Sequence, residues 1–189
     1  MKSDVDNLQR DVADHSISVT ALFQKAIVLA SKLGDDGFVA WARQELKGYT
    51  RGDKEVEYRC LKGQYVVLMP DNRKLPIQWT SSVSGMNTRF ITTPLAEMES
   101  IAGSDAESFA VKISMDSQLA TSLRLQPGDS IGFEIGQTTV AGFLQEIRNR
   151  VLDWTLRLTT RTEGTVPLVP TSLKSKCASL MVTCADYGL

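Results

Sequence analysis

The feature that most constrains this chain is a long apolar repeat toward its C-terminal end. Six apolar residues recur in alternating steps of four and three: Val140, Leu144, Ile147, Val151, Trp154 and Leu158. Such steps align side chains along one stripe of an α-helix, so the sequence predicts a long helix from about Thr139 to Thr160. Successive helical residues turn by about 100°, which places Leu152 and Leu156 roughly opposite this stripe. We therefore expect a central helix that packs against neighbours on two sides.

The charged residues of this stretch lie between its two apolar sides. Glu146 precedes Arg150 by four residues, and Asp153 precedes Arg157 by the same step. This acid-first order favours ion pairs on a helix surface, each worth about 0.2–0.5 kcal/mol. The strip is therefore either a solvated, salt-bridged face or a contact surface for another copy, an effector or a phosphate backbone.

Arg148 lies on the other flank of the same helix and has no acid four residues away. We expect it to find its partner elsewhere, either at Glu45 or outside the molecule. Four arginines and two acids between Glu146 and Arg161 leave a local charge of only +2, which is too small for a nucleic-acid footprint by itself.

The first 50 residues predict helices. The stretch "SVTALFQKAIVLASKLG" has an amphipathic period with Ser18 as its N-cap and Gly34 as its C-cap. "DDGFVAWARQELKGY" follows at once, with Asp35 or Asp36 as the cap of a new helix that ends at Gly48. Two helices with so short a link must turn back on each other, so we expect an αα-hairpin. A further helix is expected in "SDVDNLQRDVAD" before it.

The middle of the chain changes to the period of strands. Alternation predicts strands near residues 55–60, 64–69, 75–79, 108–115 and 131–135. A short helix is expected from a Thr93 cap to Gly103, a weaker helix at 116–125, and a loop over the polar residues 80–90. In the first strand, we expect Glu55 and Glu57 on the solvent face.

The order of these elements predicts the fold class. Helices, then strands, then one long helix indicate an α+β domain with an N-terminal αα-hairpin and a mostly antiparallel sheet. We expect residues 1–160 to form this single domain. Residues 161–189 are expected to form an irregular tail, broken by prolines, with a short helix near 171–183.

Composition excludes several classes of function. The 21 basic and 22 acidic residues of the 189 give no global basic excess for wrapping nucleic acid. His15 is the only histidine, and Cys60, Cys177 and Cys184 lack ligand spacing, so we expect no metal site. No glycine-rich phosphate loop or nucleophile elbow is present, so no cofactor is expected and a non-enzymatic role is favoured. The lack of a leader or an apolar span predicts a cytoplasmic protein.

Two segments together resemble a known family. "KLGDDGFVAWARQELKGY" is similar to the pattern LG-x(3)-F-x(2)-W-x(3)-EL-x-GY near the start of the AbiTii domain, and "FLQEIRNRVLDWTLRL" is similar to its later IRNR-x-L-[DE]-W-x-L-x-L helix. The resemblance covers roughly residues 7–160. It points to Leu33, Gly34, Phe38, Trp41, Glu45, Leu46, Gly48, Tyr49, Ile147, Arg148, Asn149, Arg150, Leu152, Asp153, Trp154 and Leu156.

AbiTii domains occur in bacterial antiphage systems, so the resemblance implies a component of abortive-infection defence. With no catalytic constellation, we expect a sensor or interaction domain whose partner is a neighbouring effector protein or another copy of the chain. The interaction candidates are Arg148, Arg150, Asp153, Arg157 and Glu45. By helical spacing, Trp41, Tyr49 and Trp154 are structural motif residues.

Two alternatives stay open. The first is a growth-inhibiting toxin that binds or cleaves RNA through Arg148, Arg150 and Arg157, although nucleic acid is the less favoured partner. The second is a plain oligomerisation module whose heptad seam pairs across a two-fold axis to form a homo-oligomer.

Overall fold

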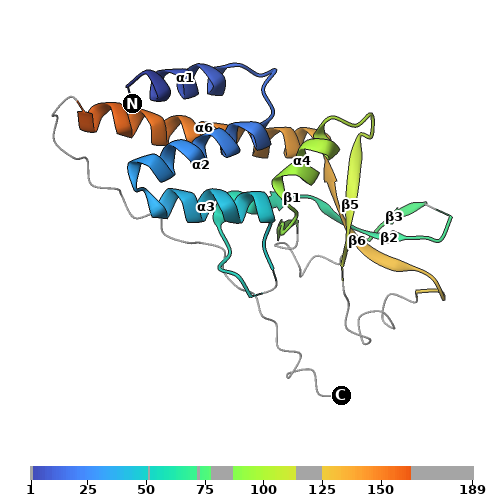
Figure 1. The fold of residues 1–189 in the computed structure, drawn as a ribbon. Helices are drawn as coiled ribbons and strands as arrows, with labels where there is room; N and C mark the ends of the chain where they lie inside the picture. Colours follow the sequence, from blue (N-terminus) through green and yellow to red (C-terminus); the bar gives the residue numbers. More distant parts are fainter. Residues whose placement is uncertain (1, 51, 72, 78–86, 114–124, 163–189) are drawn as a thin grey trace.

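A computed structural model of the protein describes residues 2–50, 52–71, 73–77, 87–113 and 125–162. Most of the helical layer is a roughly parallel stack of long helices (Figure 1). These are α1 (Lys2–Ala13), α2 (Val19–Leu33), α3 (Asp36–Lys47) and α6 (Gln137–Thr162). The short helix α4 (Leu95–Ala102) lies between this stack and the strands.

The strands extend from one end of the stack (Figure 1). Their bounds, with the preceding 3₁₀ turn, are η1 (Glu57–Arg59), β1 (Cys60–Lys62), β2 (Gln64–Leu68), β3 (Lys74–Pro76), β4 (Thr88–Phe90), β5 (Ser108–Ile113) and β6 (Ser130–Gly136). One sheet has the order β3-β2-β6-β5, and β1 pairs separately with β4. All of these described pairings are antiparallel, which confirms the predicted α+β class.

The predicted αα-hairpin is confirmed together with its caps. The side chain of Ser18 accepts a hydrogen bond from the amide of Ala21, and Gly34 ends α2 in the left-handed region at φ 71°. Asp35 then caps α3 by accepting from the amide of Phe38. Local side-chain chemistry therefore decides where α2 ends and α3 begins.

The long helix α6 is central, as its two apolar sides predict. In the seam, Val140, Ile147 and Val151 are fully buried and Trp154 is nearly so. On the opposite side, Leu152 also packs against the core, but Leu156 is 47% exposed, so the expected second packed side is only partly present. The seam therefore packs inside this chain and is not a free surface for a second copy.

Two predictions in the middle of the chain are wrong. Residues 57–59, expected within a strand, form the 3₁₀ turn η1, and the strand begins only at Cys60. In a strand over residues 55–60, Arg59 would lie on the same face as Glu55 and Glu57, yet Arg59 is fully buried. The turn carries its side chain inward to a partner on α3. Residues 88–90, expected in a loop, form β4 because β1 supplies an antiparallel neighbour.

Helix α4 begins differently from its predicted cap. Pro94 takes the N-cap position, and no side-chain hydrogen bond caps the helix in the described structure. Thr93 is instead buried, and its carbonyl accepts a hydrogen bond from Arg59. The expected strand at 75–79 is shorter, at Lys74–Pro76. Residues 78–79, most of the weaker helix at 116–125 and the tail helix near 171–183 lie outside the described residues.

Gly48 is required where α3 meets the segment before α4. Its φ is 82° with ψ 179°, a conformation that non-glycine residues rarely adopt. A Cβ atom built there would stand 2.6 Å from the carbonyl oxygen of Thr92 and 2.9 Å from the nitrogen of Pro94. The close approach lets the amide of Tyr49 donate to that same Thr92 oxygen at 2.8 Å.

We predict that Gly48→Ala lowers the free energy of unfolding by about 3 kcal/mol, because backbone strain and a backbone clash add together. Gly34→Ala is the matched control: its φ is also positive, but no described atom lies within 4 Å of an added Cβ. That change should cost only about 1 kcal/mol. Urea denaturation of both variants checks this, and equal losses would contradict the clash.

Candidate functional site

The two sequence motifs meet at the start of α3. One carboxylate oxygen of Asp35 caps α3, and the other accepts a hydrogen bond from Nε1 of Trp154 at 2.9 Å. The rings of Phe38 and Trp154 stack with centroids 3.9 Å apart. The motif around α3 and the motif on α6 therefore form one structural unit.

A buried ion pair lies at the other end of α3. The side chains of Glu45 and Arg59 are both 0% exposed. Nε and Nη2 of Arg59 donate to Oε2 of Glu45 at 2.9 and 2.7 Å. The hydroxyls of Tyr49 and Tyr58 donate to Oε1, each at 2.7 Å. Four donors thus surround the carboxylate, which is the condition for burying its charge.

The remaining groups of Arg59 are also engaged. Its Nη1 donates to the carbonyls of Ile91 and Thr93, both at 2.9 Å. The guanidinium carbon lies 4.7 Å from the centroid of Tyr49 and 5.2 Å from that of Phe143. One arginine therefore joins α3, the segment before α4, and α6. Sequence reasoning missed Arg59, because its alternating neighbours indicate a solvent-facing residue.

The same burial changes the acidity of the two tyrosines. Burial, reinforced by the negative charge of Glu45, raises the pKa of Tyr58 to about 12. Burial and the hydrogen bond to Glu45 likewise raise the pKa of Tyr49 above its usual range. Both hydroxyls therefore stay protonated at neutral pH and act as hydrogen-bond donors.

Arg148 does not pair with Glu45, so that expectation is wrong. Arg148 is 5% exposed, and its guanidinium points to the end of α1. Nη1 donates to the carbonyls of Val12 and Asp14 at 3.0 and 3.1 Å, and Nη2 donates to that of Ile17. The residue thus caps the C-terminal end of α1, where a cation is favoured by unpaired carbonyls and the helix dipole.

The other charged candidates on α6 behave differently from one another. Arg150 forms the expected ion pair with Glu146 at 2.9 Å, and its guanidinium carbon lies 3.9 Å from the centroid of Tyr58. Asp153 and Arg157 are exposed, and their expected pair is not among the ion pairs of the described residues. Arg150 therefore extends the buried network toward the surface, whereas Asp153 and Arg157 face solvent.

Trp41 completes the network from the side of α3. Its Nε1 donates to the hydroxyl of Tyr58 at 2.8 Å. Its ring contacts those of Phe23 and Phe38, with centroids 5.2 Å away in each case. The structural motif residues Trp41, Tyr49 and Trp154 thus all contribute polar contacts as well as packing.

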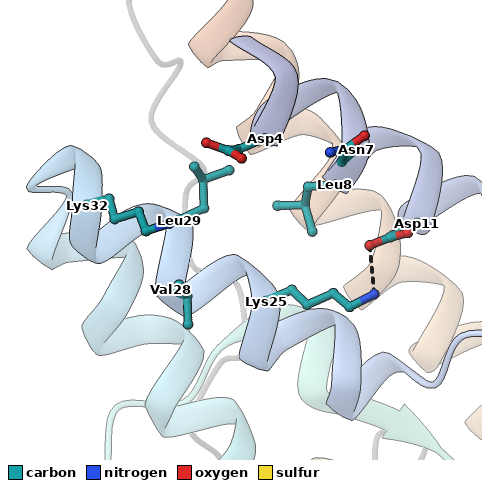
Figure 2. Close-up of a pocket in the computed structure, with 8 residues that line it drawn as sticks. All are labelled: Asp4, Asn7, Leu8, Asp11, Lys25, Val28, Leu29 and Lys32. Carbon is teal, nitrogen blue, oxygen red and sulfur yellow. Dashed lines mark hydrogen bonds and ion pairs between the residues drawn. The ribbon is translucent and has the colours of Figure 1, made fainter. Parts of the chain in front are cut away.

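A shallow groove of about 270 Å³ lies on the surface between α1 and α2 (Figure 2). The buried side chains of Leu8 and Leu29 form its floor, and the 56% exposed Val28 stands beside them. The residues that line it are Asp4, Asn7, Leu8 and Asp11 from α1 and Lys25, Val28, Leu29 and Lys32 from α2. We name this surface the α1–α2 groove.

Sequence reasoning missed this groove, although two signals for it were present. Asp4 and Asp11 are seven residues apart, as are Lys25 and Lys32. Seven residues are about two helical turns, so each pair lies along one wall. Val28 is an apolar residue outside the stripe that α2 turns to the core. The sequence does not show that α1 packs beside α2, and without that contact these residues do not define a surface.

The described residues contain no group of three or more histidine, cysteine, aspartate or glutamate side chains arranged to hold a metal ion. None of their helices combines the length and the apolar character needed to cross a membrane.

The chain can be assigned to a known protein family. Residues 5–182 match the AbiTii family. The chain belongs to the AbiTii family. Membership implies a role in bacterial abortive-infection defence. The match extends beyond the two motifs, which end within α6, and no curated protein and no solved structure matches the chain significantly.

In this AbiTii chain, we predict that Glu45→Gln lowers the free energy of unfolding by about 3–5 kcal/mol, because it leaves the Arg59 charge buried without a counter-charge. Glu146→Gln is the matched control, since it breaks the half-exposed pair with Arg150 and should cost under about 1 kcal/mol. Thermal or urea unfolding checks this, and similar losses in the two variants would contradict the role of Glu45.

We also predict that stability falls as the pH rises above about 10. An unfolded tyrosine loses its proton near pH 10, whereas folded Tyr58 keeps it to about 12. The folded state therefore binds the proton more tightly, and its advantage is present below pH 10 and is lost as the pH rises through 12. Urea midpoints at pH 9, 10 and 11 should fall less steeply in Tyr58→Phe than in the wild type. Parallel slopes would refute this assignment.

Proposed function

We propose that this chain is a non-enzymatic protein-interaction domain of an abortive-infection system, acting in the cytoplasm through the α1–α2 groove. Family membership supports the defence role. The observation that carries the interaction role is the groove itself, an apolar floor beside an exposed valine and between charged walls. Apolar surface framed by polar residues is typical of sites that bind other proteins.

The hydrogen bonds of the buried polar residues support a non-enzymatic role. Glu45, Tyr58 and Arg59 would be the natural candidates for acid–base chemistry, but their polar groups are engaged with one another. A catalytic base must come within hydrogen-bond reach of a substrate. These side chains instead hold α3, the 3₁₀ turn and α6 together, so the motif builds a scaffold on which a contact surface can lie.

The alternative of an RNA-binding toxin has less support. Arg148 donates its hydrogen bonds to the carbonyls at the end of α1. Arg150 forms an ion pair with Glu146 and lies over the ring of Tyr58. A phosphate backbone approaching the α1–α2 groove would meet Asp4 and Asp11 as well as the lysines. Binding that neutralises phosphates needs a surface dominated by positive charge.

We predict that Val28→Glu abolishes phage protection, raising plating efficiency at least tenfold in cells carrying the gene among its native neighbours. A glutamate on the apolar part of the groove would be buried by any docked protein at a large desolvation cost. Leu156→Glu on α6 is the matched control, since Leu156 is 47% exposed and lies outside the groove. It should protect like the wild type.

Both variants should accumulate as folded protein, because each replaced side chain is exposed in the chain itself. Circular dichroism checks this. Full protection by Val28→Glu, or an equal loss in both variants, would overturn the groove as the functional surface.

A further inference from the structure

The charges of the α1–α2 groove are arranged as a self-complementary set. Its acids, Asp4 and Asp11, lie on α1, and its lysines, Lys25 and Lys32, lie on α2. The two helices run in opposite directions (Figure 1), and Asp11 pairs with Lys25 across the groove at 2.8 Å (Figure 2). The groove therefore carries one acidic wall and one basic wall, with no net charge between these four residues.

We propose that the α1–α2 groove binds the same groove of a second copy, forming a two-fold symmetric dimer. The proposal rests on the proposed function, for which it names the partner. A half-turn about an axis that runs along the groove turns the two grooves face to face, exchanges their walls and keeps their ends. Asp4 of one copy then lies over Lys32 of the other, and Asp11 over Lys25. Every contact occurs twice, as in any isologous interface.

The apolar residues fit the same arrangement. Val28 projects beside the groove, while Leu8 and Leu29 form its floor. In the two-fold pair, Val28 of each copy enters the hollow of the other, and about 270 Å³ leaves room for that side chain. The contact removes from water a valine that is 56% exposed in the single chain. Burial of apolar surface supplies the attraction, and the charges supply the register.

The size of the helices sets the expected strength. Helices of 12 and 15 residues are about 18 and 22 Å long and each about 10 Å wide. Together they present roughly 400 Å² of flat face per copy, about half of the 800 Å² per partner of a standard interface. We therefore expect a weak dimer whose population rises with protein concentration.

The experiment is sedimentation of the full chain over a range of concentrations, with two charge variants. Lys25→Glu with Lys32→Glu makes both walls acidic, and Asp4→Lys with Asp11→Lys makes both walls basic. Each variant alone should be monomeric, with its dissociation constant raised at least tenfold over the wild type. An equimolar mixture should restore the dimer, because every acidic wall then meets a basic one.

The four positions lie on the surface groove, so both variants should keep the fold, and circular dichroism verifies this. A wild type that stays monomeric at all concentrations would overturn the dimer, as would two folded variants whose mixture remains monomeric. An acidic variant that dimerises like the wild type would do the same.

Phage challenge separates this proposal from the proposed function. A monomeric wild type combined with loss of protection in Val28→Glu would overturn the dimer and leave the interaction role standing, with a different protein as occupant. Loss of the dimer in Val28→Glu with full phage protection would support the dimer and overturn the groove's role in defence.

Discussion

The rest of the fold depends on burying the charge of Glu45 beside that of Arg59. An isolated ion is very costly in an apolar interior, so each must find its counter-charge and enough hydrogen-bond partners. Arg59 satisfies this by leaving the strand path in a 3₁₀ turn and binding the carbonyls of Ile91 and Thr93. The hydroxyls of two tyrosines donate hydrogen bonds to the other oxygen of the Glu45 carboxylate. Helix α3, the first strand and the segment before α4 are thereby fixed relative to one another.

A second arginine is buried mainly against backbone carbonyls. Arg148 is buried against the carbonyls that end α1. It joins the first helix to the central helix α6, across 136 residues of sequence from Val12. Because α1 supplies one wall of the α1–α2 groove, this internal contact positions a surface feature. Arg148 thus helps to place the α1–α2 groove without lining it.

This arrangement gives the two parts of the molecule different tasks. Polar residues of the motifs, such as Glu45 and Arg148, are buried in the interior, where their hydrogen bonds determine how the helices are placed. The groove charges on α1 and α2 remain at the surface, where they form one acidic wall and one basic wall. Such a division suits the proposed interaction role, because a contact surface that keeps its shape before a partner arrives binds at a lower entropic cost.

The sequence by itself determined the features that depend on local chemistry. Ser18, Gly34 and Asp35 mark helix ends through hydrogen bonds to nearby residues, and the seam of α6 follows from helical geometry alone. Tertiary structure decided the partners of Arg59 and Arg148, because 14 residues separate Glu45 from Arg59 and 136 separate Val12 from Arg148. It also decided the α1–α2 groove, since charges spaced by seven define a surface only after two helices pack side by side.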